Sequence, residues 1–308
     1  MYIVRHRTLF FWITGLILVA AIAAIAIFKL PLGIDFTGGS LMQVSYQNGA
    51  PALATIQQEV ATVPLGAISV LDSGANQVNI RTRTLSPEEH TAVLAALAQG
   101  DASTTSTSSP QVTELAFTSV GPSLGGQFTT KALEALLAVA LVIILYIAWA
   151  FRKVSRPVPS WGYGIAVVAM LAIDLIVPTG FYAILCHYTG AEVDSLFVVA
   201  LLALLGYCVN DVIVIFDRIR EHLAKNEKMN IKESFEDTIG KSIDETMRRS
   251  INTALTVALA LIALIYLGAP ATKDFALVML VGVVIGTFSS ICRSAPLLIP
   301  LARWFQKR

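Results

Sequence analysis

Charged side chains are scarce in this sequence, and their scarcity indicates the class of protein. Only 14% of the 308 residues are Asp, Glu, Lys or Arg, whereas 55% are hydrophobic, and the mean hydropathy is +0.69. Soluble domains carry about 25% charged residues, so the composition predicts a membrane protein. The net charge of +1 provides no global basic field, so we expect no nucleic-acid partner.

Cysteine and histidine are also few. The three cysteines all lie inside apolar runs, which argues against a disulfide framework or a CxxC metal site; they are Cys186, Cys208 and Cys292. The four histidines are scattered, without metal-ligand spacing. We therefore expect neither a metal nor another cofactor.

A complete P-loop is missing as well. Gly240-Lys241-Ser242 is similar to the end of that motif, but position 235 is Phe where the motif requires Gly. ATP is therefore not expected as the direct energy source of this chain, and we expect that it is not an enzyme.

Six apolar stretches are long enough to span a membrane. About 20 helical residues, at about 1.5 Å each, cross a hydrocarbon core of about 30 Å. The predicted spans are Leu9–Phe28, Leu133–Phe151, Trp161–Cys186, Ser195–Phe216, Ile251–Leu267 and Phe275–Leu301. The first follows Arg5 and Arg7, as a secretion signal would. Its apolar core runs to about 20 residues, longer than the usual 7–15, so we favour an uncleaved helix.

Lys and Arg are distributed unevenly between the ends of these spans. They gather at both termini and after the second and fourth spans, and include Arg5, Arg7, Arg152, Arg156, Arg220, Lys228, Arg303 and Arg308. Positively charged segments stay in the cytoplasm. We therefore expect a protein of the cytoplasmic (inner) membrane with both termini in the cytoplasm. Residues 1–30 then hold the N-terminus and first helix. Residues 131–308 hold a five-helix bundle with a cytoplasmic loop at residues 217–250.

Residues 31–130 are expected outside as one α+β domain with two similar halves. The predicted elements are strands Ser40–Tyr46, Ala67–Leu71, Gln77–Arg83 and Gln111–Thr118, and helices Pro51–Val63 and Pro87–Ala98. Ser86 precedes the second helix and Glu89 follows three residues later, which is typical of a capping box. The order βαββαβ predicts a ferredoxin-like domain, and the Ser/Thr-rich stretch Asp101–Pro110 predicts a loop.

Two carboxylates lie inside predicted membrane helices, Asp174 in the third and Asp211 in the fourth. A bare carboxylate in lipid costs roughly 2.5–3.5 kcal/mol on insertion scales, so each is expected to face the bundle interior or a water cavity. A simple hydrogen bond to a neighbouring helix is the alternative for both, and an interfacial position is another for Asp211. Asn210, with Gly206 and Tyr207 one turn before, favours a tight and partly hydrated helix contact at Asp211.

Arg249 begins the fifth predicted span. It is either an ordinary positive anchor, as Arg248 is expected to be, or a partner that approaches Asp211. A nearby cation favours the ionised carboxylate, whereas burial favours the protonated form. A carboxylate that moves between these environments can load and release a proton. In the last span, Gly282 and Gly286 form a GxxxG pattern that allows close helix packing.

Four segments together resemble the SecD/SecF family, and within it SecF. They contain Asp35, Gly38 and Gly39 after the first span; Gly121 and Pro122 before the second; Gly206, Tyr207, Asn210, Asp211, Asp217 and Arg218 in and after the fourth; and Arg249 to Thr253 at the start of the fifth. The third segment is the most specific, because few unrelated proteins share that polar string inside a membrane helix. Cys208 stands where the family usually has Ser.

The resemblance implies a bundle of the RND type and a partnership with SecD and the SecYEG translocon. It also implies use of the proton motive force to help an unfolded polypeptide cross the membrane. Asp211 and Arg249 map to the family's proton path, with Asp174 and Asn210 as further candidates. Three alternatives stay open: a proton-driven RND-type exporter of small molecules or lipids, an intramembrane aspartyl protease, and a passive scaffold.

Overall fold

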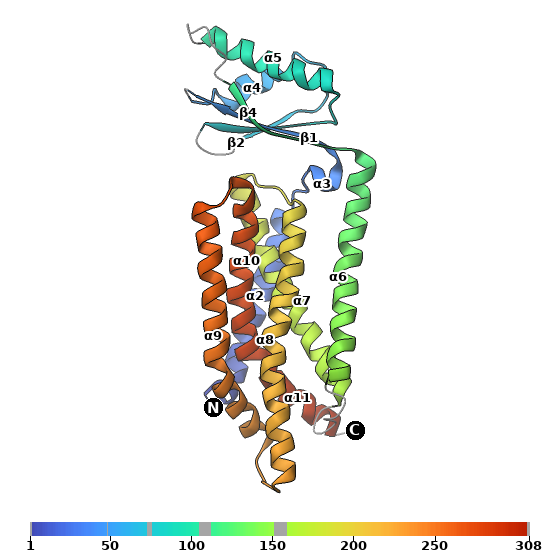
Figure 1. Cartoon of the computed structure of the whole chain (residues 1–308), viewed down its shortest axis with the longest axis vertical. Helices are drawn as coiled ribbons and strands as arrows, with labels where there is room; N and C mark the ends of the chain where they lie inside the picture. The colour runs from blue at the N-terminus through green and yellow to red at the C-terminus, as the bar shows by residue number, and fades with distance from the viewer. Residues whose placement is uncertain (1, 48, 73–75, 105–111, 151–158, 307–308) are drawn as a thin grey trace. The chain divides into compact units, whose positions relative to one another are not determined.

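The computed structural model divides the chain into two compact units (Figure 1). It describes residues 2–47, 49–72, 76–104, 112–150 and 159–306. One unit is helical and comprises residues 1–29, 134–184 and 195–308. The other contains a β-sheet and comprises residues 30–133 and 185–194.

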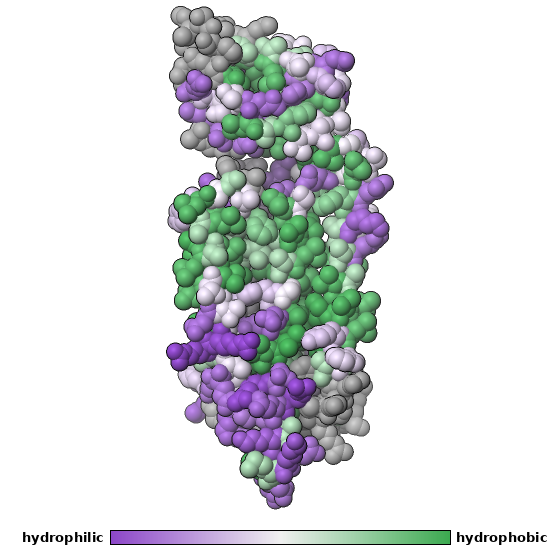
Figure 2. All heavy atoms as spheres, viewed as in Figure 1, coloured by the Kyte–Doolittle hydropathy of each residue, from purple (hydrophilic) through white to green (hydrophobic). Residues whose placement is uncertain are grey.

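Long helices build the helical unit. They are α1 (Tyr2–Arg5), α2 (Arg7–Phe28), α6 (Pro122–Ala150), α7 (Ser160–Thr189), α8 (Ser195–Lys228), α9 (Phe235–Leu267), α10 (Pro270–Ser289), the π-helix η1 (Ser290–Ser294) and α11 (Ala295–Gln306). Within the described residues, six helical segments are long and apolar enough to cross a membrane, with α10, η1 and α11 forming the sixth. The six predicted spans are confirmed. On the face shown in Figure 2, hydrophobic residues gather over the middle of the bundle.

The segment 217–250, expected as a loop, is mostly helix. Helix α8 continues to Lys228 and α9 already begins at Phe235, so only residues 229–234 connect them. The Ser234 hydroxyl accepts the N–H of Asp237 at 3.1 Å and caps α9. Ion pairs between the two extensions, including Arg218 with Glu245, allow the hydrophilic helices to pack outside the apolar region. Figure 2 shows the hydrophilic surface gathered at that end of the bundle.

Helix α8 lies in the middle of the bundle's core. Its buried side chains pack with those of α6, α7, α9 and α11. Helix α10 approaches α8 closely, because a Cβ atom on Gly282 would overlap Leu204 and one on Gly286 would overlap the Cys208 sulfur. The GxxxG pattern is therefore used inside the chain, for packing α10 against α8.

The second unit contains one four-stranded antiparallel sheet in the order β2-β3-β1-β4. Its strands are β1 (Gly39–Tyr46), β2 (Ser69–Asp72), β3 (Gln77–Thr82) and β4 (Val112–Val120), and its helices are α3 (Ile34–Thr37), α4 (Leu53–Val60) and α5 (Pro87–Thr104). The predicted strands and helices of both halves are confirmed within a few residues. Helices α4 and α5 share one core with the sheet through Ile56, Val60, Val93 and Leu97.

The capping box that starts α5 is confirmed by both of its hydrogen bonds. The N–H of Glu89 donates to the Ser86 hydroxyl at 3.2 Å, and the N–H of Ser86 donates to the Glu89 carboxylate at 2.9 Å. The other end of α5 runs further than predicted, to Thr104. The rest of the expected loop, residues 105–110, lies outside the described part of the chain.

Candidate functional site

Asp211 of α8 lies in the centre of the helical unit with only 7% of its surface exposed. Ser250 of α9 donates a hydrogen bond to its Oδ1 at 2.5 Å, and Ser290 of η1 donates one to its Oδ2. Both partners are neutral hydroxyl groups. Among the described residues, no Lys or Arg forms an ion pair with this carboxylate. Asp211 is therefore a buried acid whose hydrogen bonds suit both the ionised and the protonated form.

Asp174 of α7 has a different environment. It is 1% exposed, and its Oδ1 accepts a hydrogen bond from Arg293 of η1 at 2.8 Å, an ion pair in which Arg293 is itself only 4% exposed. In the part of the chain that the structure describes, the Oδ2 atom of Asp174 has no hydrogen-bond partner. The carboxylate of Asp174 is thus compensated through one oxygen by one guanidinium.

The π-helix η1 brings the two carboxylates to the same short segment. Ser289 accepts a hydrogen bond from Arg293, and the next residue, Ser290, donates to Asp211. Pro296 lies four residues after Cys292 and cannot donate an N–H to its carbonyl. Single π turns of this kind occur inside α-helices and are frequent at functional sites. One irregular turn thereby carries Arg293, which contacts Asp174, and Ser290, which contacts Asp211.

Sequence reasoning did not single out Arg293. The signal was present, because Arg293 lies inside the last apolar span, as Asp174 and Asp211 lie inside theirs. From the sequence, Arg249 was expected either as a positive anchor or as a partner that approaches Asp211. In the structure the next residue, Ser250, contacts Asp211, whereas the side chain of Arg249 is exposed.

The other residues predicted around Asp211 lie on two faces of α8. Tyr207 is half-buried, and its hydroxyl lies 3.2 Å from that of Thr287 on α10. Asn210 and Gly206 are exposed, and a Cβ atom on Gly206 would meet nothing within 4 Å. The face of α8 that carries Gly206 and Asn210 is therefore open in this chain.

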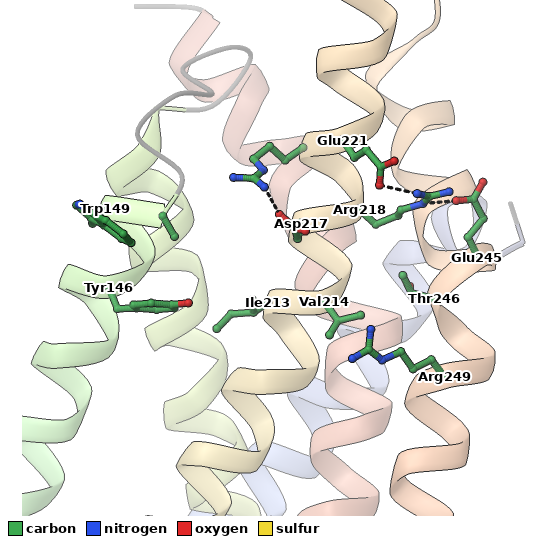
Figure 3. A pocket seen from close by; sticks show the side chains of 12 residues that line it. Tyr146, Trp149, Ile213, Val214, Asp217, Arg218, Glu221, Glu245, Thr246 and Arg249 are labelled. Carbon is green, nitrogen blue, oxygen red and sulfur yellow. Dashed lines mark hydrogen bonds and ion pairs between the residues drawn. The ribbon is translucent and has the colours of Figure 1, made fainter.

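A cavity of about 910 Å³ lies between α6, α8 and α9 (Figure 3). Its lining residues are Tyr146, Trp149, Ala150, Ile213, Val214, Asp217, Arg218, Arg220, Glu221, Glu245, Thr246 and Arg249. Figure 3 shows the Arg249 guanidinium directed from α9 towards Val214 on α8. Val214 follows Asp211 by three residues, one helical turn. The cavity thus approaches Asp211 to within about one turn of α8.

Most charges at the rim of this cavity are paired. Arg218 forms ion pairs with Glu221 at 2.5 Å and with Glu245, and Arg220 lies 2.6 Å from Asp217. Arg249 has no ion pair or side-chain hydrogen bond among the residues described. The guanidinium of Arg249 is therefore a positive charge in the cavity that is available to bind another partner. No group of His, Cys, Asp and Glu suited to a metal ion occurs in the described residues.

The remaining motif residues lie together in the second unit. Gly38 and Gly39 have φ angles of +74° and +128°, which side-chain-bearing residues rarely adopt. A Cβ atom on Gly38 would lie 2.7 Å from Cα of Pro122, and one on Gly39 would lie 2.7 Å from the Thr82 carbonyl oxygen. Gly121 directly precedes Pro122, which begins α6, and Asp35 lies in the first turn of α3. Gly38 therefore allows the chain to pass close to Pro122 at the start of α6, and Gly39 allows the start of β1 to lie close to Thr82 of β3.

Two family models match this chain. The model for "Protein export membrane protein SecD/SecF, C-terminal" matches residues 100–304, and the "SecD/SecF GG Motif" matches residues 23–50, which include the glycine pair. The chain belongs to the SecD/SecF family. The protein translocase subunit SecF of Thermobaculum terrenum is 36% identical over 304 residues, covering 96% of this chain and 92% of that relative. The SecF of Synechocystis is 33% identical, with 95% and 92% covered.

Solved structures agree with the family assignment. The crystal structure of SecDF from Thermus thermophilus, described as a translocon-associated membrane protein, has a TM-score of 0.81 at 26% identity. The match covers all of this chain and 39% of the SecDF chain. This chain is therefore a multi-pass membrane protein that spans 92% of the length of the two SecF relatives named above and about two-fifths of that SecDF chain.

The arrangement of carboxylates does not favour the aspartyl-protease alternative. Such an enzyme needs two carboxylates that face one another and share a proton. Asp174 instead contacts Arg293, and Asp211 contacts two serines. The two acids thus have separate partners and separate environments.

Proposed function

We propose that this chain is the SecF half of a SecD–SecF complex in the cytoplasmic membrane, with both termini in the cytoplasm. The complex uses the proton motive force to help unfolded polypeptides cross through the SecYEG translocon. The family and the translocon-associated SecDF neighbour support a part in Sec-dependent export. The proton-driven step is carried by one observation, the buried carboxylate of Asp211 with hydroxyl partners only.

Asp211 is the proton carrier in this proposal. A carboxylate at membrane depth is costly when ionised, which favours proton uptake, and its hydroxyl partners can donate to the ionised form or accept from the protonated one. Arg249 in the neighbouring cavity stabilises the ionised state when water reaches Asp211. Asn210 and the open face of α8 contact the partner bundle, and Asp174 belongs to the same polar centre.

The test is Asp211→Asn, which keeps the size of the side chain and removes its titration. In proteoliposomes that contain the translocon, a SecD-like partner and a preprotein, we expect normal insertion and complex formation. Gradient-dependent export should fall to the rate seen without a gradient. Asp244→Asn on the exposed face of α9 makes the same chemical change and should export at the wild-type rate. Wild-type export by Asp211→Asn would refute the proton-carrier role.

The partnership has a test of its own at Gly206. Gly206→Leu adds a large side chain to an exposed position with open space, so the chain itself should fold normally. If a SecD-like bundle packs there, the added volume should prevent close contact and reduce co-purification in mild detergent. Ala260→Leu, on an exposed position of α9, is the matched control. Equal recovery of the partner with both variants would place the partner elsewhere.

A further inference from the structure

Among the described residues, the buried centre of the helical unit holds three side chains of Asp or Arg whose charges do not sum to zero when all three are ionised. Asp174, Asp211 and Arg293 are 1%, 7% and 4% exposed. With both acids ionised, two negative charges meet one positive charge. An uncompensated charge in a dry protein interior is strongly destabilising. The cluster becomes neutral when it binds one proton.

We propose that Arg293 makes Asp174 and Asp211 a cluster that holds one exchangeable proton. In this cluster Arg293 keeps Asp174 ionised, and Asp211 is the group that loads and releases the proton. The inference rests on the proposed proton-driven function and adds a positioning residue to it. It also assigns Asp174 a fixed charge, not a proton-carrying role.

The contacts of the two acids divide the roles between them. Arg293 donates to Asp174 at 2.8 Å, and a cation at that distance strongly favours the carboxylate over the carboxyl group. Among the described residues, Asp211 accepts hydrogen bonds from Ser250 and Ser290 alone, and both are uncharged. A proton can therefore join Asp211 without breaking an ion pair, whereas protonation of Asp174 would leave the Arg293 guanidinium uncompensated.

Three observations indicate that the two halves of the cluster act on each other. Ser289, which contacts Arg293, and Ser290, which contacts Asp211, are adjacent in the chain. The thiol of Cys208 on α8 lies within electrostatic range of Asp174, Asp211 and Arg293 together. All three charged groups lie in the same buried core, where charges interact over longer distances than in water.

The other titratable groups around Asp211 are few. Helix α8 contributes Tyr207 and Cys208, both of which interact with the Asp211 charge. Helix α7 contributes Asp174 and the π-helix contributes Arg293. Helix α9 contributes Arg249, which is exposed in the cavity. The residue after it, Ser250, donates the hydrogen bond to Asp211 and does not titrate.

The loading step is a simple proton balance. A proton from water binds one oxygen of the Asp211 carboxylate, which becomes a carboxyl group, and the cluster charge changes from −1 to 0. The serine hydroxyl that donated to this oxygen rotates and accepts from the new O–H group. Release reverses both changes, and Asp174 and Arg293 stay paired throughout.

Three variants test the charge balance, each in the SecD–SecF complex reconstituted into liposomes. In Asp174→Asn, the charges of the ionised Asp211 and of Arg293 already sum to zero without a bound proton. The midpoint of the pH profile of proton flux should therefore move down by about one pH unit or more. Arg293→Gln leaves two acids without a cation, so the midpoint should move up by a similar amount. Asp174→Asn with Arg293→Gln restores the wild-type balance, and the wild-type midpoint should return to within about half a unit.

Infrared absorption of protonated carboxyl groups provides a readout that does not depend on flux. Below the wild-type midpoint we expect one buried carboxyl band, lost in Asp211→Asn and retained in the double variant. Arg293→Gln should show two such bands. If Arg293 has only a structural role, the single variants lower the yield or stability of the complex but leave the midpoint and the bands unchanged, which overturns the proposal.

The outcomes separate this inference from the proposed function. If Asp211→Asn exports normally, the proton-driven function itself fails. If Asp211→Asn abolishes export while the single variants at 174 and 293 keep the wild-type midpoint, only the charge-balance inference fails. If the single variants do not assemble, the double variant decides, because it removes Asp174 and Arg293 together and leaves neither without its partner. A wild-type midpoint supports the proposal and a shifted one overturns it.

Discussion

Arg81 of strand β3 forms an ion pair with Glu192 at 2.5 Å, although 111 residues separate them in the chain. Arg81 also donates to Thr37 at 2.6 Å. Beside this pair, the N–H of Gly33 donates to the Val193 carbonyl and the N–H of Val193 donates to the Pro31 carbonyl, both at 2.8 Å. The connection between α7 and α8 is therefore bound to the sheet-containing unit. Those two helices carry Asp174 and Asp211.

Exchanging the two residues, as Arg81→Glu with Glu192→Arg, should preserve the ion pair. Arg81→Glu and Glu192→Arg should each lower the stability of the protein by about 1 kcal/mol, since the pair is only partly exposed and each variant places like charges together. The double variant should recover most of this loss, although the contact with Thr37 is lost. Thermal unfolding in detergent measures the effect. Additive losses in the double variant would show that the pair contributes nothing.

The Glu89 carboxylate makes the stability of the sheet-containing unit depend on pH in the acidic range. A hydrogen bond from Arg83, and then one from the Ser86 N–H, hold the pKa of Glu89 below its usual range. A lowered pKa in the folded state means that the stabilisation is fully present above the unfolded pKa of about 4.3. It is lost as the pH falls through the folded pKa.

We therefore expect Glu89→Gln to flatten the decline of stability below about pH 5. The measurement is thermal unfolding, by circular dichroism, of a soluble fragment comprising residues 39–120. Ser86→Ala is the control, because it should cost about 1 kcal/mol at every pH through loss of the cap. An unchanged acid decline in Glu89→Gln would contradict the prediction. A fragment that stays disordered would contradict independent folding of this unit.

The close approach of α10 to α8 predicts a compensating pair of substitutions. Gly286→Ala places a Cβ atom against the Cys208 sulfur, and such overpacking typically costs about 1–3 kcal/mol. Cys208→Ala removes the sulfur and leaves the next Cys208 atom at an ordinary 3.7 Å. The double variant should therefore be more stable than Gly286→Ala alone. Unfolding temperatures in detergent test this, and a double variant less stable than Gly286→Ala would contradict the packing.

The orientation in the membrane is a prediction of the Lys and Arg distribution. In a cysteine-free variant, single cysteines at Ser106 and Lys228 should react with a membrane-impermeant reagent from opposite sides. The side that labels Lys228 should be cytoplasmic. Labelling of both positions from one side would contradict the six-span topology.

Local patterns predicted much of this fold. Alternating apolar residues around Val44, Val78 and Ile80 indicated strands, and those side chains form the core of the sheet-containing unit. The long apolar runs indicated the membrane helices. The extensions of α8 and α9 were expected as a loop because they are rich in charge, such as the pair Arg218 and Glu245. Their apolar residues nevertheless recur at helical spacing, since Ile239, Ile243 and Met247 lie four residues apart and pack in the core of the helical unit.

The candidate site was predictable only in part, for a related reason. The cost of an acid in lipid indicates Asp174 and Asp211 from sequence alone. Which residue pairs with each acid depends on the packing of four helices and on the π turn before Pro296, and neither is a local property. Sequence spacing favoured Arg249 for Asp211, whereas the side chain one position later, Ser250, makes the contact.

The pairing of Gly39 with Val120 places the first and last strands of the sheet side by side. The polypeptide therefore enters and leaves the sheet at nearly the same point, where Gly38 lies close to Pro122. A segment with such adjacent ends can be exchanged for another without changing the distance between its attachment points. We expect chimeras that replace residues 40–119 with the matching segment of a distant relative to insert and fold. Such a segment can therefore differ in sequence among relatives without a change in the membrane helices that it joins.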